Sequence, residues 1–285
     1  MSSAPSLGLD AKHSPVSGMR ARSRGSDVAI PKVSRPMRGW FTWYSRRYLR
    51  RHFHSLRVSR SGPPPIGCSS PLVIYSNHAS WWDPLTCLVL AKEFFAERTG
   101  FAPIDAGALK RYPFFRKLGF FPVETGSARG AVQFLQTSQA VLIDPRHMLW
   151  LTPQGRFADV RERPANFQAG LGHLARRVEH AAFVPLALEY VFWEERLPEV
   201  LARFGEPLPV PAESGAHDAH TWTHVLEQHL EANQNALAYE VLRRDPTDFQ
   251  TVLRGGAGQG GVYDWWRGLK ARVRGETFTK EHGDK

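Results

Sequence analysis

Short apolar segments alternate with longer amphipathic segments from about residue 72 onward. The short runs have the length and the Val, Ile and Phe content of buried strands, whereas the longer segments repeat apolar residues every three to four positions, as helices do. Strand-like segments span residues 72–76, 101–104, 120–123, 148–152 and 183–188, and helix-like segments span residues 83–98, 108–118, 128–142, 170–180 and 221–243. We therefore predict an α/β fold with a mostly parallel central sheet flanked by helices.

A basic amphipathic helix is predicted before this domain, over residues 37–60. Aromatic and apolar residues recur on one side at helical spacing, and arginines fill much of the opposite side. The first group is Met37, Trp40, Phe41, Tyr44 and Tyr48, and the second is Arg46, Arg47, Arg50 and Arg51. A basic helix with an aromatic face is typical of a segment that lies in a membrane interface. The alternative is that this face packs on the protein's own domain.

The positive charge of the chain is concentrated at its N-terminal end. The 285 residues carry a formal net charge of +10, and the first 60 residues contain 13 Lys/Arg against two acids, Asp10 and Asp27. The other 225 residues contain 24 Lys/Arg and 25 acids, so they are close to neutral. A basic arm on a neutral body favours an anionic membrane surface as partner. Nucleic acid is not the expected partner, because no recognition motif accompanies the charge.

The remaining segments set the expected domain boundaries. Residues 1–36 are rich in Ser, Gly, Pro and Arg without an apolar period, and we expect a disordered basic tail. The α/β domain is expected over residues 61–255, and residues 256–285 are expected to form a glycine-rich turn and a helix rich in Trp and Arg. No apolar run approaches the roughly 18 residues of a membrane-spanning helix. The two cysteines, Cys68 and Cys87, give neither a disulfide framework nor a metal-binding spacing.

A candidate catalytic pair follows the first strand of this predicted domain. His78 ends the strand, and Asp83 comes five positions later, directly before Pro84. Neutral histidine suits general-base chemistry near pH 7, and a carboxylate on its second ring nitrogen fixes the tautomer and stabilises the imidazolium. Asp83 is also predicted to be the N-cap of the following helix, with Pro84 at the first helical position, and the alternative is that this is its only role. The context of a strand, an aromatic pair and a helix start favours the catalytic interpretation.

Four blocks of sequence occur in a characteristic order between about residues 70 and 190. They are NHASWWD at 77–83, KRYPFFRKLGFFPVE at 110–124, LTPQGRF at 151–157 and FVPLAL at 183–188. The first is similar to the N-H-x-S-x-W-D block of the glycerolipid acyltransferase family, to which 1-acylglycerol-3-phosphate acyltransferase belongs. The others resemble the second, third and fourth blocks of that family. The order of the four blocks makes the resemblance strong.

This resemblance implies transfer of an acyl group from acyl-CoA or acyl carrier protein to a hydroxyl of a lysophospholipid such as 1-acylglycerol-3-phosphate. His78 would deprotonate the hydroxyl and Asp83 would orient His78, with no metal or bound cofactor. The residues that it implies for substrate binding are Asn77, Ser80, Gln154, Gly155 and Arg156. Together with the basic helix, the resemblance implies a peripheral enzyme on the cytoplasmic face of an anionic membrane.

Three departures from the family pattern concern the acceptor. Glu124 is followed by Thr125 and Gly126 where the family usually has an arginine that is implicated in holding the acceptor phosphate. Gln154 replaces the usual glutamate of the third block, and Arg156 stands one place earlier than the family's arginine. These departures leave two alternatives open. One is acylation of a non-phosphate acceptor such as a glycosylated pigment or another lipid alcohol, and the other is a catalytically silent lipid-binding scaffold.

Overall fold

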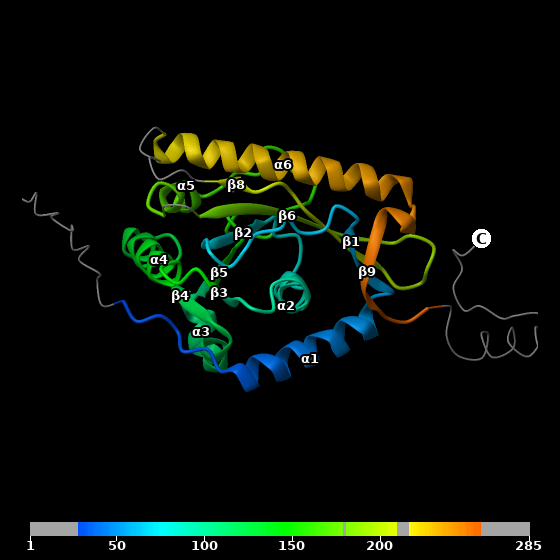
Figure 1. The fold of residues 1–285 in the computed structure, drawn as a ribbon, viewed down its shortest axis with the longest axis horizontal. Coiled ribbons are helices and arrows are strands. Elements are labelled where there is room, and N and C mark those ends of the chain that lie inside the picture. Colours follow the sequence, from blue (N-terminus) through cyan, green and yellow to red (C-terminus); the bar gives the residue numbers. More distant parts are fainter. Residues whose placement is uncertain (1–27, 179–180, 210–216, 258–285) are drawn as a thin grey trace, which may run out of the picture.

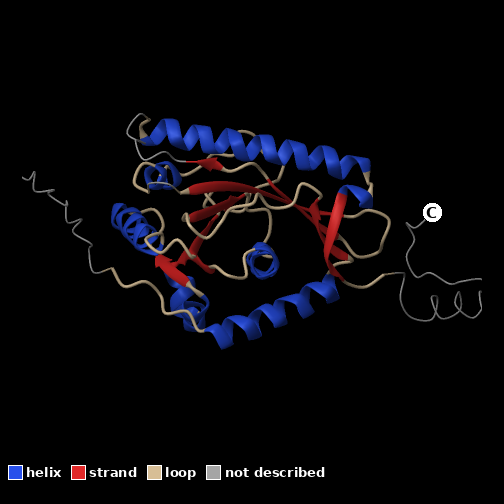
Figure 2. Ribbon diagram, viewed as in Figure 1, coloured by secondary structure: helices blue, strands red, loops and turns tan. Residues whose placement is uncertain are grey.

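A computed structural model describes residues 28–178, 181–209 and 217–257 of the chain, which form a sheet with helices on both faces (Figures 1 and 2). The strands are β1 (Ser55–Ser59), β2 (Leu72–Ser76), β3 (Thr99–Asp105), β4 (Phe120–Val123), β5 (His147–Leu151), β6 (Ala182–Val191), β7 (Glu199–Phe204), β8 (Leu208–Pro209) and β9 (Phe249–Arg254). The α-helices are α1 (Arg35–His52), α2 (Asp83–Phe94), α3 (Ala106–Arg111), α4 (Ala128–Val141), α5 (Gly170–Ala175) and α6 (Ala219–Arg243). Two 3-10 helices, η1 (Pro113–Leu118) and η3 (Pro246–Asp248), complete the described elements.

The sheet is mostly parallel, which confirms the predicted fold class. Its strand order is β4-β3-β5-β2-β6-β7-β1-β9, with β8 paired to β6 beside this path. The pairs β3–β4, β3–β5, β2–β5, β2–β6 and β1–β7 are parallel, and β6–β7, β6–β8 and β1–β9 are antiparallel. The carboxyl end of β2 therefore opens between those of its parallel neighbours β5 and β6.

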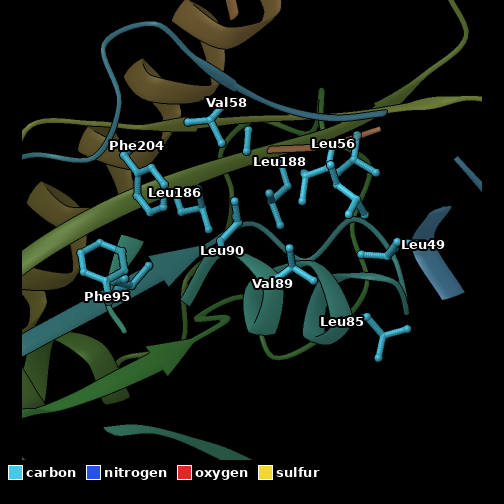
Figure 3. Packing of buried hydrophobic residues seen from close by; sticks show 14 of the residues in the cluster. Leu49, Leu56, Val58, Leu85, Val89, Leu90, Phe95, Leu186, Leu188 and Phe204 are labelled. Carbon is cyan, nitrogen blue, oxygen red and sulfur yellow. The ribbon is translucent and has the colours of Figure 1, made fainter. Parts of the chain in front are cut away.

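Side chains alternate between two cores on the faces of the central strand β2. Leu72 and Ile74 pack in the core that includes Leu85, Val89 and Leu90 of α2. Figure 3 shows these α2 side chains with Leu186 and Leu188 of β6. On the opposite face, Val73 and Tyr75 pack with residues of α4, α5 and α6. Helix α1 runs outside α2, and α6 covers the other side of the sheet (Figure 1). Helix α2 is thus held rigidly between α1 and the sheet.

The predicted N-terminal helix is present but shorter than expected. Helix α1 ends at His52, and Phe53 is already extended, with φ −124° and ψ 148°. Residues 55–59 form strand β1 between β7 and β9, so the prediction of helix up to residue 60 was wrong. Arg57 made this segment look like part of the basic helix. Its guanidinium is instead buried in the sheet and lies 2.6 Å from the carboxylate of Glu199, which compensates its charge.

The ends of other helices and strands also differ from the predicted ones. The expected helix 108–118 is divided into α3 and η1, because the residue before a proline disfavours helical backbone and Pro113 follows Tyr112. Helix α2 ends at Phe94 and α5 ends at Ala175, both earlier than expected. Strand β9 begins at Phe249, where only a tail leading into the glycine-rich turn was expected.

The expected terminal segments lie largely outside the described residues. Residues 28–34 were expected to belong to the disordered tail, but Ile30 and Val33 pack against the core and the side chain of Ser34 caps α1. The predicted C-terminal helix with its two tryptophans falls within residues 258–285, outside the described residues.

Candidate active site

The turn after β2 is fixed to the neighbouring strand β6 by Asn77. Its side-chain amide donates to the carbonyl oxygen of Leu188 at 2.9 Å and accepts from the Leu188 amide at 2.9 Å. Asn77 is buried, so these two bonds replace the backbone ladder where β2 ends. This bidentate contact sets the direction in which the chain leaves the sheet, and therefore the position of the next residue, His78.

His78 and Asp83 lie in direct contact, as the sequence predicted. The Nδ1 atom of His78 is 2.7 Å from Oδ2 of Asp83. The same oxygen accepts the backbone N–H of Ser80 at 3.1 Å, which closes the turn. The Asp83 side chain is 2% exposed and the His78 side chain is 21% exposed. Because the carboxylate accepts at Nδ1, that nitrogen carries the proton, and Nε2 is the ring nitrogen with a free lone pair in the neutral imidazole.

The predicted N-cap role of Asp83 was wrong. Helix α2 begins at Asp83 itself, its N-cap position is Trp82, and no side chain caps it. The carboxylate of Asp83 points back to the turn, where it binds His78 and Ser80, while Pro84 occupies the first turn of the helix. The described helix start therefore leaves the carboxylate free to orient the histidine.

Tyr190, near the end of β6, completes the network around Asp83. Its hydroxyl donates to Oδ1 of Asp83 at 2.7 Å. Burial, and then the charge of Asp83, raise the pKa of Tyr190 well above its usual range, so the hydroxyl keeps its proton at neutral pH. Sequence reasoning missed this residue, although a tyrosine that closes a buried strand is a signal for a hydroxyl with a specific partner.

The loop after β5 supports His78 from the other side. The side-chain Oε1 of Gln154 accepts the backbone N–H of His78 at 2.9 Å, and the His78 carbonyl accepts the N–H of Ala158, also at 2.9 Å. Gln154 is buried, so its neutral amide holds the turn without adding charge. Gly155 has a φ of +66°, which places it in the left-handed region that glycine adopts readily. The ring of Phe157 packs against the imidazole, with centroids 4.3 Å apart.

Arg156 lies apart from this network. Its guanidinium forms an ion pair with Glu162, and this hydrogen bond raises the pKa of Arg156 and lowers that of Glu162. The structure thus brings five of the residues singled out in the sequence to one turn: Asn77, His78, Ser80, Asp83 and Gln154. Gly155 lies on the adjoining loop and also lines the cleft described next.

A cleft of about 1840 Å³ opens beside His78 and Asp83. It passes between α2, β3 and α4, and one side of α1 forms part of its wall. Its apolar lining includes Leu88, Ala91, Ile104, Phe134 and Trp150. Sites for drug-sized ligands usually enclose about 300–1,000 Å³. A histidine–aspartate pair at the edge of a larger, mainly apolar cleft suits chemistry on a hydroxyl of a long apolar molecule.

Basic side chains also line the cleft. They are Arg35, Arg38, Arg46, Lys92 and Arg98. Arg46 pairs with Glu93 at 3.3 Å, and Arg98 donates to four backbone carbonyl groups. Burial, and then the neighbouring charge of Arg35, lower the pKa of Arg38. Within residues 28–178, 181–209 and 217–257, no ion pair neutralises Arg35 or Arg38.

Exposed aromatic residues form what we call the aromatic face, defined as Trp40, Trp43, Tyr44, Trp81, Tyr112 and Phe114. Ring contacts connect its parts: Trp40 stacks on Tyr44 at 6.0 Å, Tyr48 links Tyr44 to Trp81, and Phe41 contacts Phe114. Trp81 lies in the turn between β2 and α2, between His78 and Asp83 in the sequence. Phe41 and Tyr48 pack on the core, so α1 uses its aromatic residues both for packing and for exposure. In the part of the chain that the structure describes, no helix has the length and apolar character to cross a bilayer.

The sequence of the chain matches the model of one protein family over the region that contains this site. The model of the family described as Acyltransferase matches residues 50–189 of the chain. The matched region runs from the end of α1 to one residue before Tyr190, and it contains His78, Asp83 and Gln154. No curated protein matches the chain.

Proposed function

The chain belongs to the glycerolipid acyltransferase family, and from this premise we propose that it transfers a fatty acyl group from acyl-CoA or acyl carrier protein to a hydroxyl of a lysophospholipid. The observation that carries the proposal is the 2.7 Å contact between His78 and the buried carboxylate of Asp83 at the edge of a large apolar cleft. A base with its orienting carboxylate is the minimum that activation of a hydroxyl requires.

The reaction would proceed in two steps. Nε2 of His78 takes the proton of the acceptor hydroxyl as its oxygen attacks the thioester carbonyl, and Asp83 stabilises the imidazolium that forms. The tetrahedral oxyanion then collapses, the carbon–sulfur bond breaks, and the leaving thiolate takes the proton back from His78. His78 thereby returns to its starting form, and no metal or bound cofactor takes part in the proposed chemistry.

A phosphate on the acceptor is supported by the basic side chains of α1. Burial, and then the charge of Arg35, lower the pKa of Arg38. Arg35 and Arg38 line the same cleft as His78, and no ion pair among the described residues neutralises either of them. An anionic head group would supply that missing charge. The ion pair of Arg156 with Glu162 favours the second candidate, a non-phosphate lipid alcohol, because the charge of Arg156 is then already neutralised within the protein.

An acceptor panel separates these functions. Purified protein would be given radiolabelled acyl-CoA or acyl carrier protein with 1-acylglycerol-3-phosphate, with monoacylglycerol, and with a total lysolipid extract. We expect transfer to 1-acylglycerol-3-phosphate, at least about tenfold faster than to monoacylglycerol, because a charge-assisted contact contributes about 1.5–3 kcal/mol. The opposite preference would establish the second candidate. No transfer to any lipid with either donor would overturn the enzymatic proposal, and activity gained only by Gln154→Glu would favour the silent scaffold.

We also propose that the protein lies peripherally on an anionic membrane, at its cytoplasmic face. The aromatic face supports this, because Trp and Tyr rings partition into the membrane interface. Exposed basic residues flank it on α1 and on the α3–η1 segment: Arg47, Arg50, Arg51, Lys110, Arg111, Arg116 and Lys117. Each contributes about 1 kcal/mol near an anionic surface. With Trp81 in the interface, the catalytic turn would meet a lysolipid at the depth of its head group.

The variant Trp40→Ala/Tyr44→Ala should bind vesicles more weakly. These side chains are 59% and 39% exposed, and losing their partial insertion should weaken binding about 10- to 100-fold, since a fully buried apolar side chain contributes about 1.5–3 kcal/mol. Co-sedimentation with phosphatidylglycerol vesicles measures the change. Tyr239→Ala/Leu242→Ala is the matched control, because both residues are exposed on α6 at the opposite side of the molecule (Figure 1). Equal binding by all three proteins would contradict the proposed orientation.

A further inference from the structure

The carboxylate of Asp83 accepts hydrogen bonds from three donors, two in the turn that precedes it and one on β6. Oδ2 receives Nδ1–H of His78 and the backbone N–H of Ser80, and Oδ1 receives the hydroxyl of Tyr190. The contacts to His78 and Tyr190 are both 2.7 Å long, which is the length expected for hydrogen bonds to a carboxylate. Tyr190 therefore binds the oxygen that the histidine does not use.

Tyr190 is held in place by both its backbone and its side-chain contacts. Its backbone lies in the antiparallel ladder between β6 and β7, opposite Val200. Its ring contacts Phe53, with centroids 5.8 Å apart. The hydroxyl of Thr86 is 3.4 Å away, so Asp83 is the closer partner of the tyrosine oxygen. A hydroxyl on a central strand can thus hold the first turn of α2 in a fixed relation to the sheet.

We propose that Tyr190 is a positioning residue of the acyl transfer reaction, which orients the Asp83 carboxylate toward His78 and limits the negative charge that the histidine experiences. This inference rests on the proposed function. The O–H dipole of Tyr190 stabilises charge on Oδ1 and so draws it away from Oδ2. Without this bond, Asp83 would stabilise the imidazolium more strongly and could also rotate away from its productive orientation.

The other groups around Asp83 do not supply this effect. Asp83 also acts on the thiol of Cys87 on α2, whose pKa is raised by burial and then by Asp83, so the thiol stays neutral. His78 itself faces the apolar ring of Phe157. Thr86 is not titratable. Apart from His78 itself, Tyr190 is therefore the described residue whose side chain can tune the His78–Asp83 pair through a hydrogen bond to Asp83, whereas Ser80 donates through its backbone N–H.

The test is Tyr190→Phe, with Tyr75→Phe as its matched control. Tyr75, on the adjacent strand β2, also has a partly buried hydroxyl in a hydrogen bond, but its partner is His229 on the other face of the sheet. For Tyr190→Phe we expect kcat to fall about tenfold with KM within about twofold, as for the loss of one hydrogen bond to a charged group. The midpoint of the acid limb of the pH profile of kcat/KM should move to higher pH, because a stronger electrostatic attraction to Asp83 stabilises the protonated form of His78. Tyr75→Phe should leave that midpoint unchanged.

A second variant keeps the hydroxyl and changes its strength. Site-specific 3-fluorotyrosine at position 190 is a stronger donor, so it should move the acid limb to lower pH, opposite to phenylalanine. The low-field proton resonance of His78 Nδ1 should shift in both variants, which gives a readout independent of turnover. An active enzyme whose acid limb and resonance stay fixed in both variants would overturn the role of Tyr190. If the wild-type protein transferred no acyl group, the proposed function would fail instead. The role of the Tyr190–Asp83 contact would then be rejected only if the Nδ1 resonance of His78 were also the same in the wild type and in both variants.

Discussion

Replacing His78 by alanine is expected to abolish nearly all acyl transfer while the protein remains folded. The imidazole is the group placed to accept the hydroxyl proton, and a general base contributes about 10²- to 10⁴-fold to a reaction rate. The backbone bonds of His78 to Gln154 and Ala158 do not involve the imidazole, so the turn should keep its shape. We expect kcat to fall about 10³-fold or more, and the melting temperature to change little.

The measurement is the initial rate of radiolabelled acyl transfer, with circular dichroism and thermal melting as folding controls. His224→Ala is the matched control, because His224 is exposed on α6 and lies outside the cleft that contains His78. Its activity should equal that of the wild type. If His78→Ala kept more than about a tenth of the wild-type rate, His78 would not be the base, since even a weak general base accounts for about 10²-fold.

The central part of the fold and the contact between His78 and Asp83 could be predicted because their signals are local. The five predicted strands are short apolar runs, and each is followed or preceded by a segment with helical spacing of its apolar residues. His78 and Asp83 are five residues apart, so the turn between a strand and a helix brings them together without any long-range information. Gln154 was found because its sequence block could be compared with a known pattern.

Tyr190 could not be found in this way, because it is 107 positions from Asp83. The two residues meet because β6 lies beside β2, with Ser76 opposite Leu186, and this register is not visible in either segment alone. Strands β1 and β7 were missed for a related reason. Their buried charges, Arg57 and Glu199, satisfy each other across adjacent strands, whereas each looks like a surface residue in its own segment.

The corrected helix start changes what Asp83 must do. An N-cap binds backbone N–H groups two or three positions ahead of it, and asparagine can replace aspartate there at little cost. Asp83 instead accepts from His78, from Ser80 behind it in the chain, and from Tyr190. Two of the three donors approach one oxygen, and that oxygen is the one that holds the histidine. The carboxylate charge is therefore needed at this position in a way that a cap does not require.

Asp83→Asn is accordingly expected to lower kcat about 10²- to 10⁴-fold, because the amide cannot stabilise the imidazolium and, in one orientation, favours the wrong tautomer of His78. Asp218→Asn is the matched control. Asp218 is a true N-cap, with its carboxylate 2.7 Å from the N–H of Thr221 at the start of α6, and the substitution should leave both activity and thermal stability nearly unchanged. The rates of acyl transfer and the melting temperatures of both variants show whether the Asp83 carboxylate acts in the reaction or only in the structure. If Asp83→Asn were as active as Asp218→Asn, the carboxylate would have only a structural role, and the chemistry would rest on His78 alone.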